Sequence, residues 1–481
     1  MVEGIVIKST SNLNEVLLNG PADIGSFLVY EENEEKLIYK IVSLEYRTEE
    51  EGIIKYSQAQ KMLESKELNS STKYLIAMCK PICLVKEGSV KNLKRIAHLY
   101  SKMRSIKEDD LSFLPKSGIF IGKVRDGSNV LNIDVKMESR AFITHHVLIT
   151  ANTGKGKSNI LKVMLWSLLN SSTVGAFVID PHGEYFSVLE KNDNYREMGL
   201  FYAPTDRKKG NSLIINVKSI MPGHFEGIFN LTDAQLDLAY LLFKEANNRW
   251  ISELFNEKST YVNNLLSQRQ IQPITLKTLQ RKITTQLGLN KDKEGKVFTL
   301  EEGRGEGTIK NIVESVLSGK IVIIDTSSLY EEQELLITSI IANNLFKEKI
   351  NAKEEGRNTS PVAIVLEEAP KVLGESIPGD NIFKKIAREG RKFGVGLIAV
   401  TQMASVIPKD ILANMNTKII LGNDSALERN VIISIAPQDL SLEDREIATL
   451  EKGEGIISSS LQNIAIPFKA PLVETLYKKG Q

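Results

Sequence analysis

The segment Ala151-Asn152-Thr153-Gly154-Lys155-Gly156-Lys157-Ser158 decides how the rest of this chain is interpreted. It has the form G-x-x-x-x-G-K-[S/T], with Ala in place of the first Gly. The apolar run 146–150 before it indicates a strand, and residues 159–170 after it indicate a helix. A loop between a strand and a helix offers backbone N–H groups and the positive end of the helix dipole to phosphates. The segment therefore predicts a phosphate-binding loop that holds a nucleoside triphosphate.

The residues of this loop have separate expected roles. Lys157 is expected to reach the β- and γ-phosphates of ATP, and the Ser158 hydroxyl is expected to ligate Mg²⁺. A Cβ at position 151 restricts a tight backbone turn, but Gly154 and Gly156 remain, so we expect the loop to close. The residues expected to line the nucleotide are Ala151, Asn152, Thr153, Gly154, Lys155, Gly156, Lys157, Ser158 and Asn159.

Size and composition set the broad class. A chain of 481 residues predicts about two or three domains. Its 42% hydrophobic and 25% charged residues are typical of a soluble globular protein. No apolar run approaches the ~18 residues that span a bilayer, and the start, residues 1–4, shows no signal peptide, so we expect a cytoplasmic protein without a membrane partner. The net charge of +1 says little about nucleic acid, so local charge must carry that argument.

Cysteine usage does not indicate a metal site. Cys79 and Cys83 are the only two cysteines of the chain, and two ligands do not make a zinc centre. Both lie in apolar runs that indicate strands, so we expect buried small side chains.

The chain changes character near residue 118. Before it, short β-like runs such as 4–7, 26–30 and 37–42 are separated by polar turns, which predicts a small barrel or sandwich, with a connecting helix over 90–105. After it, strands and helices alternate, and short strands rich in Val and Ile predict a parallel sheet buried on both faces. The expected strands of this sheet are 146–150, 175–180, 321–325, 362–367, 396–401 and 418–421.

A helix-rich stretch interrupts the expected sheet. Residues 225–318 are too long for a simple crossover, so we interpret them as an inserted helical subdomain of an α/β fold. The expected domains are an N-terminal barrel at 1–115, a first part of the α/β core at 116–224, the insertion at 225–318, a second part of the core at 319–440 and a C-terminal extension at 441–481.

Two adjacent carboxylates follow one of the expected strands. The apolar run 364–366 ends in Glu367 and Glu368, and a buried strand that delivers acids to its carboxyl edge complements a phosphate-binding loop. We assign Glu367 to Mg²⁺ and Glu368 to the general base that takes a proton from the attacking water.

Further polar side chains follow the neighbouring strands. Gln402 ends the run 397–401, where it can orient water or sense the γ-phosphate, although an ordinary strand end is the alternative. The segment 180–185, Asp-Pro-His-Gly-Glu-Tyr, follows another strand, which leaves Asp180 and His182 open between a binding site and a plain turn.

A basic run precedes the strand that ends at Gln402. Residues 384–392 hold five Lys or Arg in nine positions, and Lys384, Arg388 and Arg391 fall on one helix face. The interpretation without a function is a helix face exposed to solvent. The functional ones are an arginine that acts on the ATP of a neighbouring subunit, either Arg388 or Arg391, or contact with DNA phosphates.

Taken together, these segments resemble the HerA family, hexameric DNA translocases of archaea within the FtsK–HerA superfamily. The segments that carry the resemblance are 151–158, 180–185, Leu366-Glu367-Glu368-Ala369, Arg388-Glu389-Gly390-Arg391-Lys392-Phe393-Gly394 and Thr401-Gln402. The N-terminal β-rich segment looks like the small barrel of that family. Two departures stand out: Ala151 replaces the usual Gly, and Pro370 stands where the family commonly has His.

The resemblance implies properties that composition and spacing do not. It implies a RecA-like P-loop ATPase core, a homohexameric ring with ATP sites between subunits, and double-stranded DNA in the central channel. It also implies a NurA-type nuclease as partner, in DNA end resection, double-strand break repair and homologous recombination. By the same likeness, Asp180 and its segment lie beside the nucleotide.

Three rival functions remain at this stage. One is a conjugation- or secretion-type motor ATPase, which commonly works at membranes. A second is a nucleotide-gated DNA-binding scaffold with little turnover, which Ala151 keeps open. The third is an ATPase that remodels proteins, for which polypeptide rather than DNA would stimulate hydrolysis.

Overall fold

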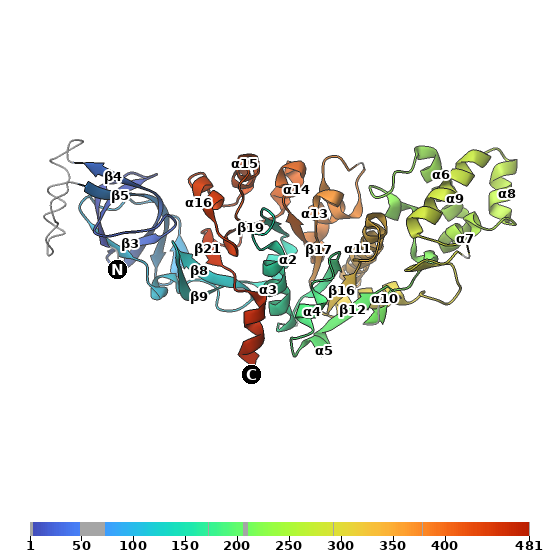
Figure 1. Cartoon of the computed structure of the whole chain (residues 1–481), viewed down its shortest axis with the longest axis horizontal. Helices are drawn as coiled ribbons and strands as arrows, with labels where there is room; N and C mark the ends of the chain where they lie inside the picture. Colours follow the sequence, from blue (N-terminus) through green and yellow to red (C-terminus); the bar gives the residue numbers. More distant parts are fainter. Residues whose placement is uncertain are drawn as a thin grey trace. The chain divides into compact units, whose positions relative to one another are not determined.

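The computed structural model describes residues 3–48, 73–171, 173–204, 210–291, 293–377 and 379–480 (Figure 1). The chain divides into two compact units. The first unit comprises 1–138, 149–163 and 416–476, and the second comprises 139–148, 164–415 and 477–481. Within the described residues, every helix is too short or too polar to span a bilayer.

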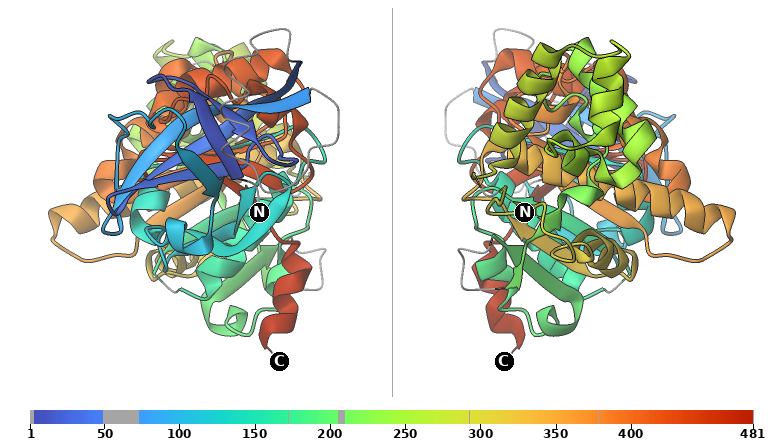
Figure 2. Two further views of the ribbon diagram at one scale, coloured as in Figure 1. Left: turned by 90° about the vertical axis from the view of Figure 1, so that its left-hand side faces the viewer. Right: turned by 90° about the vertical axis from the view of Figure 1, so that its right-hand side faces the viewer.

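Six antiparallel strands close into a barrel in the first unit. They follow the order β2-β1-β7-β3-β4-β5, and the pairing of β2 with β5 closes the ring while β6 extends β5 (left view of Figure 2). Side chains such as Val16, Leu28, Tyr39 and Cys79 fill the interior, because alternate residues of each strand face it. The strands are β1 (Glu3–Lys8), β2 (Asn14–Leu18), β3 (Phe27–Glu32), β4 (Glu35–Thr48), β5 (Lys73–Lys86), β6 (Ser89–Lys91) and β7 (Lys102–Ser105). The small barrel predicted from the sequence is confirmed, and both cysteines are buried and free, as expected.

The connecting helix expected over 90–105 is wrong. This stretch holds the end of β6, a non-helical segment and then β7, which pairs with both β1 and β3. Met103 of β7 is buried in the barrel core. Closing the barrel requires extended backbone here, and this tertiary demand overrides the local helical tendency.

The rest of the first unit is an antiparallel layer with two short helices. Its strands follow the order β19-β20-β21-β8-β9. They are β8 (Ile119–Asp126), β9 (Asn129–Met137), β19 (Thr417–Leu421), β20 (Glu454–Ser459) and β21 (Ile466–Lys469), with α15 (Ala426–Ile435) and α16 (Asp444–Thr449) beside them.

Buried ion pairs join the barrel to α16. Lys40 Nζ lies 2.6 Å from one carboxylate oxygen of Glu446, and Arg125 Nη2 lies 2.5 Å from the other. All three side chains are buried, and the two cations hold the pKa of Glu446 below its usual value although burial acts in the opposite direction. Removing one partner would leave a buried charge unpaired, which is costly, so these pairs fix the placement of α16 on the barrel.

Parallel strands form the sheet of the second unit. Their order is β13-β12-β16-β11-β17-β18, and all these pairings are parallel. Strands β11, β16, β17 and β18 are buried along their whole length, which explains their continuous apolar sequences. The strands are β11 (Gly175–Asp180), β12 (Gly199–Ala203), β13 (Asn211–Ser212), β16 (Ile321–Asp325), β17 (Val362–Leu366) and β18 (Val395–Thr401). The α/β fold with a parallel sheet is confirmed.

Helices connect and cover these strands (Figure 1). The longest, α11 (Glu331–Glu354), follows β16 and packs against α13, which precedes β18. The other helices of this layer are α2 (Ser139–Thr144), α4 (Phe186–Leu189), α5 (Tyr195–Met198), α10 (Thr308–Leu317), α12 (Pro370–Leu373), α13 (Ile382–Phe393) and α14 (Lys409–Asn414).

The inserted helical region predicted between the second and third core strands is also confirmed. Its helices appear in light green in the right view of Figure 2. Trp250 of this region is fully buried, lies beside the ring of Phe225, and donates from Nε1 to the Ile220 carbonyl at 2.8 Å. The region contains α6 (Asp233–Ala246), α7 (Trp250–Leu254), α8 (Thr260–Ser267) and α9 (Pro273–Leu287), with the small parallel pair β14 (Ile215–Asn216) and β15 (Phe298–Thr299).

His146 is a buried titratable group that fastens α2 to the sheet. Its backbone adopts a φ of 57°, and its Nδ1 accepts a hydrogen bond from the Leu397 N–H of β18 at 2.9 Å. Burial lowers the pKa of His146 to about 4, and the charges of His145 and Arg391 act in the same direction. The neutral imidazole is therefore the form that the fold requires.

Replacing His146 with Asn tests this requirement. Asn tolerates a positive φ and offers a carbonyl acceptor, but it does not titrate. The unfolded chain takes up a proton on His146 near pH 6.5 and the folded chain only near pH 4, so wild-type stability rises with pH across this window. We expect the wild type to lose about 3 kcal/mol more than His146→Asn between pH 7 and pH 4. Urea unfolding at several pH values measures this difference, and parallel stability curves for the two proteins would contradict it.

Candidate active site

The predicted phosphate-binding loop is fastened within the first unit by hydrogen bonds to two distant segments. The Asn152 N–H donates to the Gly422 carbonyl at 3.0 Å, just after β19. The Gly453 N–H donates to the Lys155 carbonyl at 3.0 Å, just before β20, and Lys155 Nζ donates to the Leu450 carbonyl at 2.9 Å. The loop conformation is thus set by the chain that flanks two antiparallel strands.

The two glycines of the loop occupy positions that other residues avoid. Gly154 has a φ of +79° and Gly156 a φ of +110°. Ala151, which stands where the motif usually has Gly, is fully buried and does not have a positive φ. Its Cβ therefore adds no backbone strain, and the loop closes as expected.

Lys157 and Ser158 open the helix that follows the loop. The loop leads from β10 (Val147–Thr150) into α3 (Lys157–Leu169), as the sequence predicted. Lys157 Nζ donates to the carbonyls of Ala151 and Asn152 at 2.8 and 3.1 Å, so its charge lies against the loop backbone. Ser158 follows in the first turn of this helix, near the positive end of its dipole.

Asn159 has a structural task that the sequence did not reveal. Its side-chain amide donates to the Pro471 carbonyl at 2.8 Å, and its side-chain carbonyl accepts from the Val473 N–H at 3.0 Å. Both ends of the side chain are therefore engaged by the segment after β21. Thr153, by contrast, is exposed at the tip of the loop.

A second group of predicted residues lies in the second unit, at the carboxyl edge of the parallel sheet. Asp180 ends β11, Glu367 follows β17, and Gln402 follows β18. Because these strands are parallel neighbours, their carboxyl ends meet at one edge. Asp325, which ends β16 opposite Asp180, joins the group and was missed, although it carries the same signal of a buried strand that ends in an acid.

Glu367 is the partly buried acid that follows β17 at this edge. The Tyr185 hydroxyl donates a hydrogen bond to Glu367 Oε1. Burial raises the pKa of Glu367 to about 7, although the bond from Tyr185 and the nearby His182 act to lower it. Tyr185 is itself fully buried, so the orientation of the Glu367 carboxylate is fixed by a side chain that sequence reasoning did not single out.

The segment 180–185 was left open between a binding site and a plain turn, and Asp180 and His182 differ in this respect. The Asp180 carboxylate is buried and accepts from the backbone N–H groups of Glu184 and Tyr185, each at 3.0 Å. It therefore holds the turn that carries Tyr185 to Glu367. His182 lies at the exposed tip of the same turn.

Glu368 differs from Glu367 in its exposure and in its partners. Its side chain is 54% exposed, and its backbone has a φ of 53°, a conformation that costs on the order of 1–3 kcal/mol for a residue other than Gly. Lys371 Nζ lies 2.6 Å from Glu368 Oε2 and 3.2 Å from Glu331 Oε2 at the start of α11. Lys371 was not anticipated from the sequence, although its i+3 spacing from Glu368 is a usable signal.

Glu367, Glu368 and Lys371 line a pocket of about 150 Å³ at the carboxyl edge. Its lining contains both acids that follow β17 together with hydroxyl, imidazole and ammonium groups. The lining residues are Pro181, His182, Thr326, Ser327, Leu329, Glu331, Glu334, Glu367, Glu368 and Lys371.

The two candidate arginines of α13 have different surroundings. Arg388 is ion-paired, with Nη1 2.6 Å from Asp380 and Nη2 3.5 Å from Asp410. Arg391 is exposed and lines a separate basic pocket. Lys384, on the same predicted face, is buried and donates to the carbonyls of Ile377 and Gly379. Gln402 is exposed at the end of β18.

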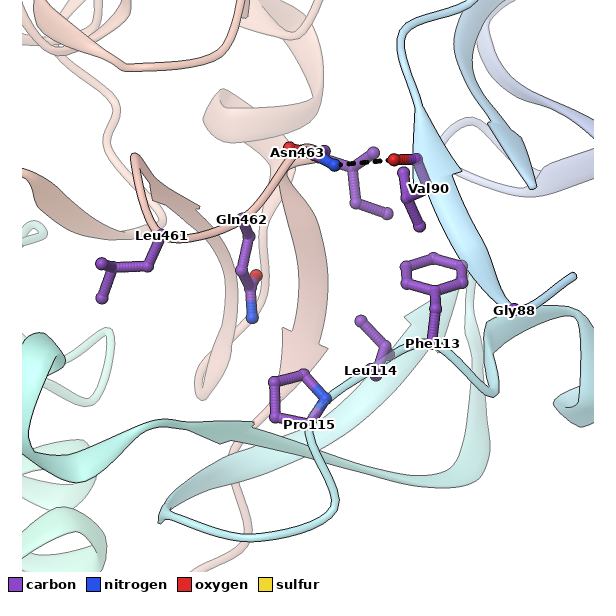
Figure 3. Close-up of a pocket in the computed structure, with 9 residues that line it drawn as sticks. Gly88, Val90, Phe113, Leu114, Pro115, Leu461, Gln462 and Asn463 are labelled. Carbon is purple, nitrogen blue, oxygen red and sulfur yellow. Dashed lines mark hydrogen bonds between the residues drawn. The ribbon is translucent and has the colours of Figure 1, made fainter. Parts of the chain in front are cut away.

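Another pocket, in the first unit, has a different character (Figure 3). It measures about 240 Å³, and its lining contains no ionisable side chain. Asn463 Nδ2 donates to the Val90 carbonyl at 3.0 Å across it. Such a neutral lining does not suit a nucleotide phosphate. The residues are Gly88, Val90, Phe113, Leu114, Pro115, Leu461, Gln462, Asn463 and Ile464.

The fold and the loop define a RecA-like P-loop protein. Residues 119–345 match the family described as "Helicase HerA, central domain", so the resemblance inferred from the motifs is confirmed. The chain is 27% identical over 366 residues to the DNA double-strand break repair helicase HerA of Sulfurisphaera tokodaii, covering 71% of this chain and 67% of that protein. It is 26% identical over 371 residues to the protein of the same name from Pyrococcus furiosus, covering 68% and 65%. The chain thus spans about two thirds of each relative.

A solved structure supports the fold. The structure of VirB4 of Thermoanaerobacter pseudethanolicus matches with a TM-score of 0.50 and 17% identity, covering 74% of this chain and 97% of that one.

Ala151 stands where the motif usually has Gly, and because its φ is not positive, we expect little effect of this difference on ATP binding. We expect Ala151→Gly to change ATP affinity by less than about threefold, because the loop already has its closed path. The variant should lose about 1 kcal/mol of stability, since Gly removes a buried methyl and adds freedom to the unfolded chain. Titration with a fluorescent ATP analogue and urea unfolding measure the two effects.

Ala176→Gly in β11 is the matched control, because it removes a buried methyl away from the loop. A much tighter binding of ATP by Ala151→Gly alone would show that the natural Ala weakens the site.

Proposed function

We propose that this protein is an ATP-driven DNA translocase or helicase. One observation carries the proposal. A closed phosphate-binding loop and two consecutive acids after a buried strand, Glu367 and Glu368, occur in a chain that matches the HerA central domain. The named relatives are helicases of DNA double-strand break repair, which supports the same class of activity for this chain.

ATP and Mg²⁺ are the expected ligands of the loop. Gly154 and Gly156 adopt positive φ values, as glycines of a loop whose backbone N–H groups cradle phosphates do, and Lys157 brings a positive charge to this loop. Ser158 and Glu367 offer a hydroxyl and a carboxylate, the oxygen ligands that Mg²⁺ prefers. When bound, the ion neutralises charge on the β- and γ-phosphates.

Glu367 and Glu368 take separate roles because their environments differ. Glu367 is partly buried and held by Tyr185, which suits a fixed acid that orients the Mg²⁺ shell. Glu368 is half-exposed and reaches the pocket, so its carboxylate takes the proton of the attacking water. Gln402, at the end of the adjacent strand, reads the γ-phosphate.

Arg391 is the better candidate for an arginine that acts on the ATP of a neighbouring subunit. Arg388 is held by two aspartates, whereas Arg391 carries an exposed guanidinium. Arg391 also lies at the end of α13, next to the start of β18, and therefore at the edge of the sheet opposite Glu367 and Glu368. It is thus poorly placed to serve the carboxylates of its own subunit.

The proposed assembly rests on the family resemblance. We propose a homohexameric ring that encloses duplex DNA, with ATP hydrolysis coupled to subunit motion. We further propose that it works with a NurA-type nuclease in DNA end resection, in the cytoplasm. The match to HerA repair helicases over about two thirds of their length supports these assignments.

The test of the ATPase is the substitution Glu368→Gln. It keeps the size of the side chain and removes the base, so we expect hydrolysis to fall about 10²–10⁴-fold while ATP still binds. Phosphate release and binding of a fluorescent ATP analogue measure the two quantities.

Glu375→Gln is the matched control, since it makes the same change at an exposed position seven residues further along. Full hydrolysis by Glu368→Gln would contradict the assignment of the base. Loss of ATP binding in Glu368→Gln would indicate structural damage, which unfolding measurements on the variant would reveal.

A further inference from the structure

The segment 422–424, which follows β19, supports Asn152 of the phosphate-binding loop. The Asn152 N–H donates to the Gly422 carbonyl at 3.0 Å, and the Asn152 side chain donates from Nδ2 to Asp424 Oδ2 at 2.8 Å. The backbone and the side chain of Asn152 are therefore both held by this short segment. Its position consequently bears on the path of the loop.

Gly422 brings the segment 422–424 into close contact with the loop. A Cβ at position 422 would lie 2.6 Å from the Leu450 carbonyl oxygen and 2.9 Å from Lys155 Cδ, which is closer than Cβ atoms approach such neighbours. The same Leu450 carbonyl accepts a hydrogen bond from Lys155 Nζ. The loop, the segment and the residue that follows α16 thus meet at one closely packed point, where a shift of one displaces the others.

Arg429 of α15 fastens the segment 422–424 to α16. Its Nη1 donates to the carbonyls of Asn423 and Asp424 at 3.1 and 2.9 Å. Its Nε and Nη2 lie 2.7 and 3.4 Å from the two carboxylate oxygens of Asp444, the first residue of α16. One guanidinium therefore bridges the support of the loop and the start of this helix.

The helix α16 is a fixed reference within the first unit. Lys40 and Arg125 both pair with the buried Glu446 of this helix. Lys80 Nζ lies 3.3 Å from the carboxylate of Glu443, which is buried directly before the helix. Because removing one partner of a buried ion pair is strongly unfavourable, α16 keeps its place. An arginine tied to α16 is thus tied to a rigid part of the unit.

An ordinary surface ion pair between Arg429 and Asp444 is the alternative interpretation, and such pairs contribute little. Two observations favour a larger role. The side chain of Arg429 is only 12% exposed, and its Nη1 also donates to two carbonyls. A lysine would keep the charge near Asp444, but its single nitrogen could not span the carboxylate and both carbonyls as the planar fork of arginine does.

We propose that Arg429 is a positioning residue for the phosphate-binding loop. It holds the segment 422–424, and with it Asn152, in the place relative to α16 that the closed loop requires. The proposal rests on the proposed function in one respect, that ATP is the ligand of this loop. Groups that bind a ligand must be held to within about 0.5 Å of their productive positions. A looser segment would therefore spread the N–H groups of the loop and weaken their convergence on phosphate.

The substitution Arg429→Lys tests this role, with Arg445→Lys as the matched control. Arg445 is an exposed residue of α16 at which the same change is made. Titration with a fluorescent ATP analogue gives the dissociation constant and the number of binding sites. We expect Arg429→Lys to bind the analogue about tenfold more weakly with the number of sites unchanged, because hydrogen bonds from a charged donor are lost. Arg445→Lys should bind it as the wild type does.

Hydrogen exchange of the loop without nucleotide gives a second readout. The Gly422 carbonyl protects the Asn152 N–H, and its exchange follows local opening. We expect faster exchange over 151–158 in Arg429→Lys than in the wild type and in Arg445→Lys, with no change in β3 of the barrel. A residue that contributes only to stability would reduce the number of sites, or speed exchange throughout the unit, without changing the dissociation constant. That result would overturn the proposal.

Equal affinity and equal loop exchange in all three proteins would also overturn the proposal, and so would an equal loss in Arg445→Lys. A wild type that does not bind ATP would refute the proposed function instead. In that case, faster loop exchange in Arg429→Lys alone would still support the positioning role.

Circular dichroism shows whether Arg429→Lys is folded. If it is not, Asp444→Ala replaces it, because this change releases Arg429 from α16 at a half-exposed position. We expect Asp444→Ala to bind the ATP analogue severalfold more weakly and to exchange faster over 151–158. Wild-type affinity and exchange in this variant would contradict the proposal.

Discussion

The parallel register of four buried strands is the constraint on which the rest of this structure depends. β11, β16, β17 and β18 run side by side in the same direction, so all their carboxyl ends lie at one edge. Burial on both faces excludes charged side chains from the strands themselves. Acids therefore appear only where each strand ends, and Asp180, Asp325 and Glu367 are brought together by topology alone.

The same register separates charge of opposite sign. The carboxyl edge gathers acids, while the amino edge of β17 and β18 carries the basic pocket that contains Arg391. The net charge of +1 conceals this division, because it is the balance of 61 Lys and Arg against 60 Asp and Glu over the whole chain.

Local sequence patterns predicted the parts that depend on local physics. The phosphate-binding loop needs glycines at positive φ and a helix after it, and the buried strands need runs of Val and Ile, so both were visible in the sequence. The pairing of Tyr185 with Glu367, and the anchoring of the loop by Gly422 and Gly453, were not visible. These contacts join residues far apart in the chain, so the local periodicity of apolar residues does not predict them. The prediction of a helix over 90–105 was wrong for the same reason. β7 is extended because it pairs with β1 and β3, and this pairing is not encoded in the segment itself.

The rate of ATP hydrolysis by the intact protein, with and without saturating linear duplex DNA at one salt concentration, tests the central claim most directly. A DNA translocase couples hydrolysis to movement along its track, so the account predicts that DNA raises the rate severalfold. An unchanged rate, in a sample where DNA binding is demonstrated in parallel, would contradict the claim that this protein is a DNA motor.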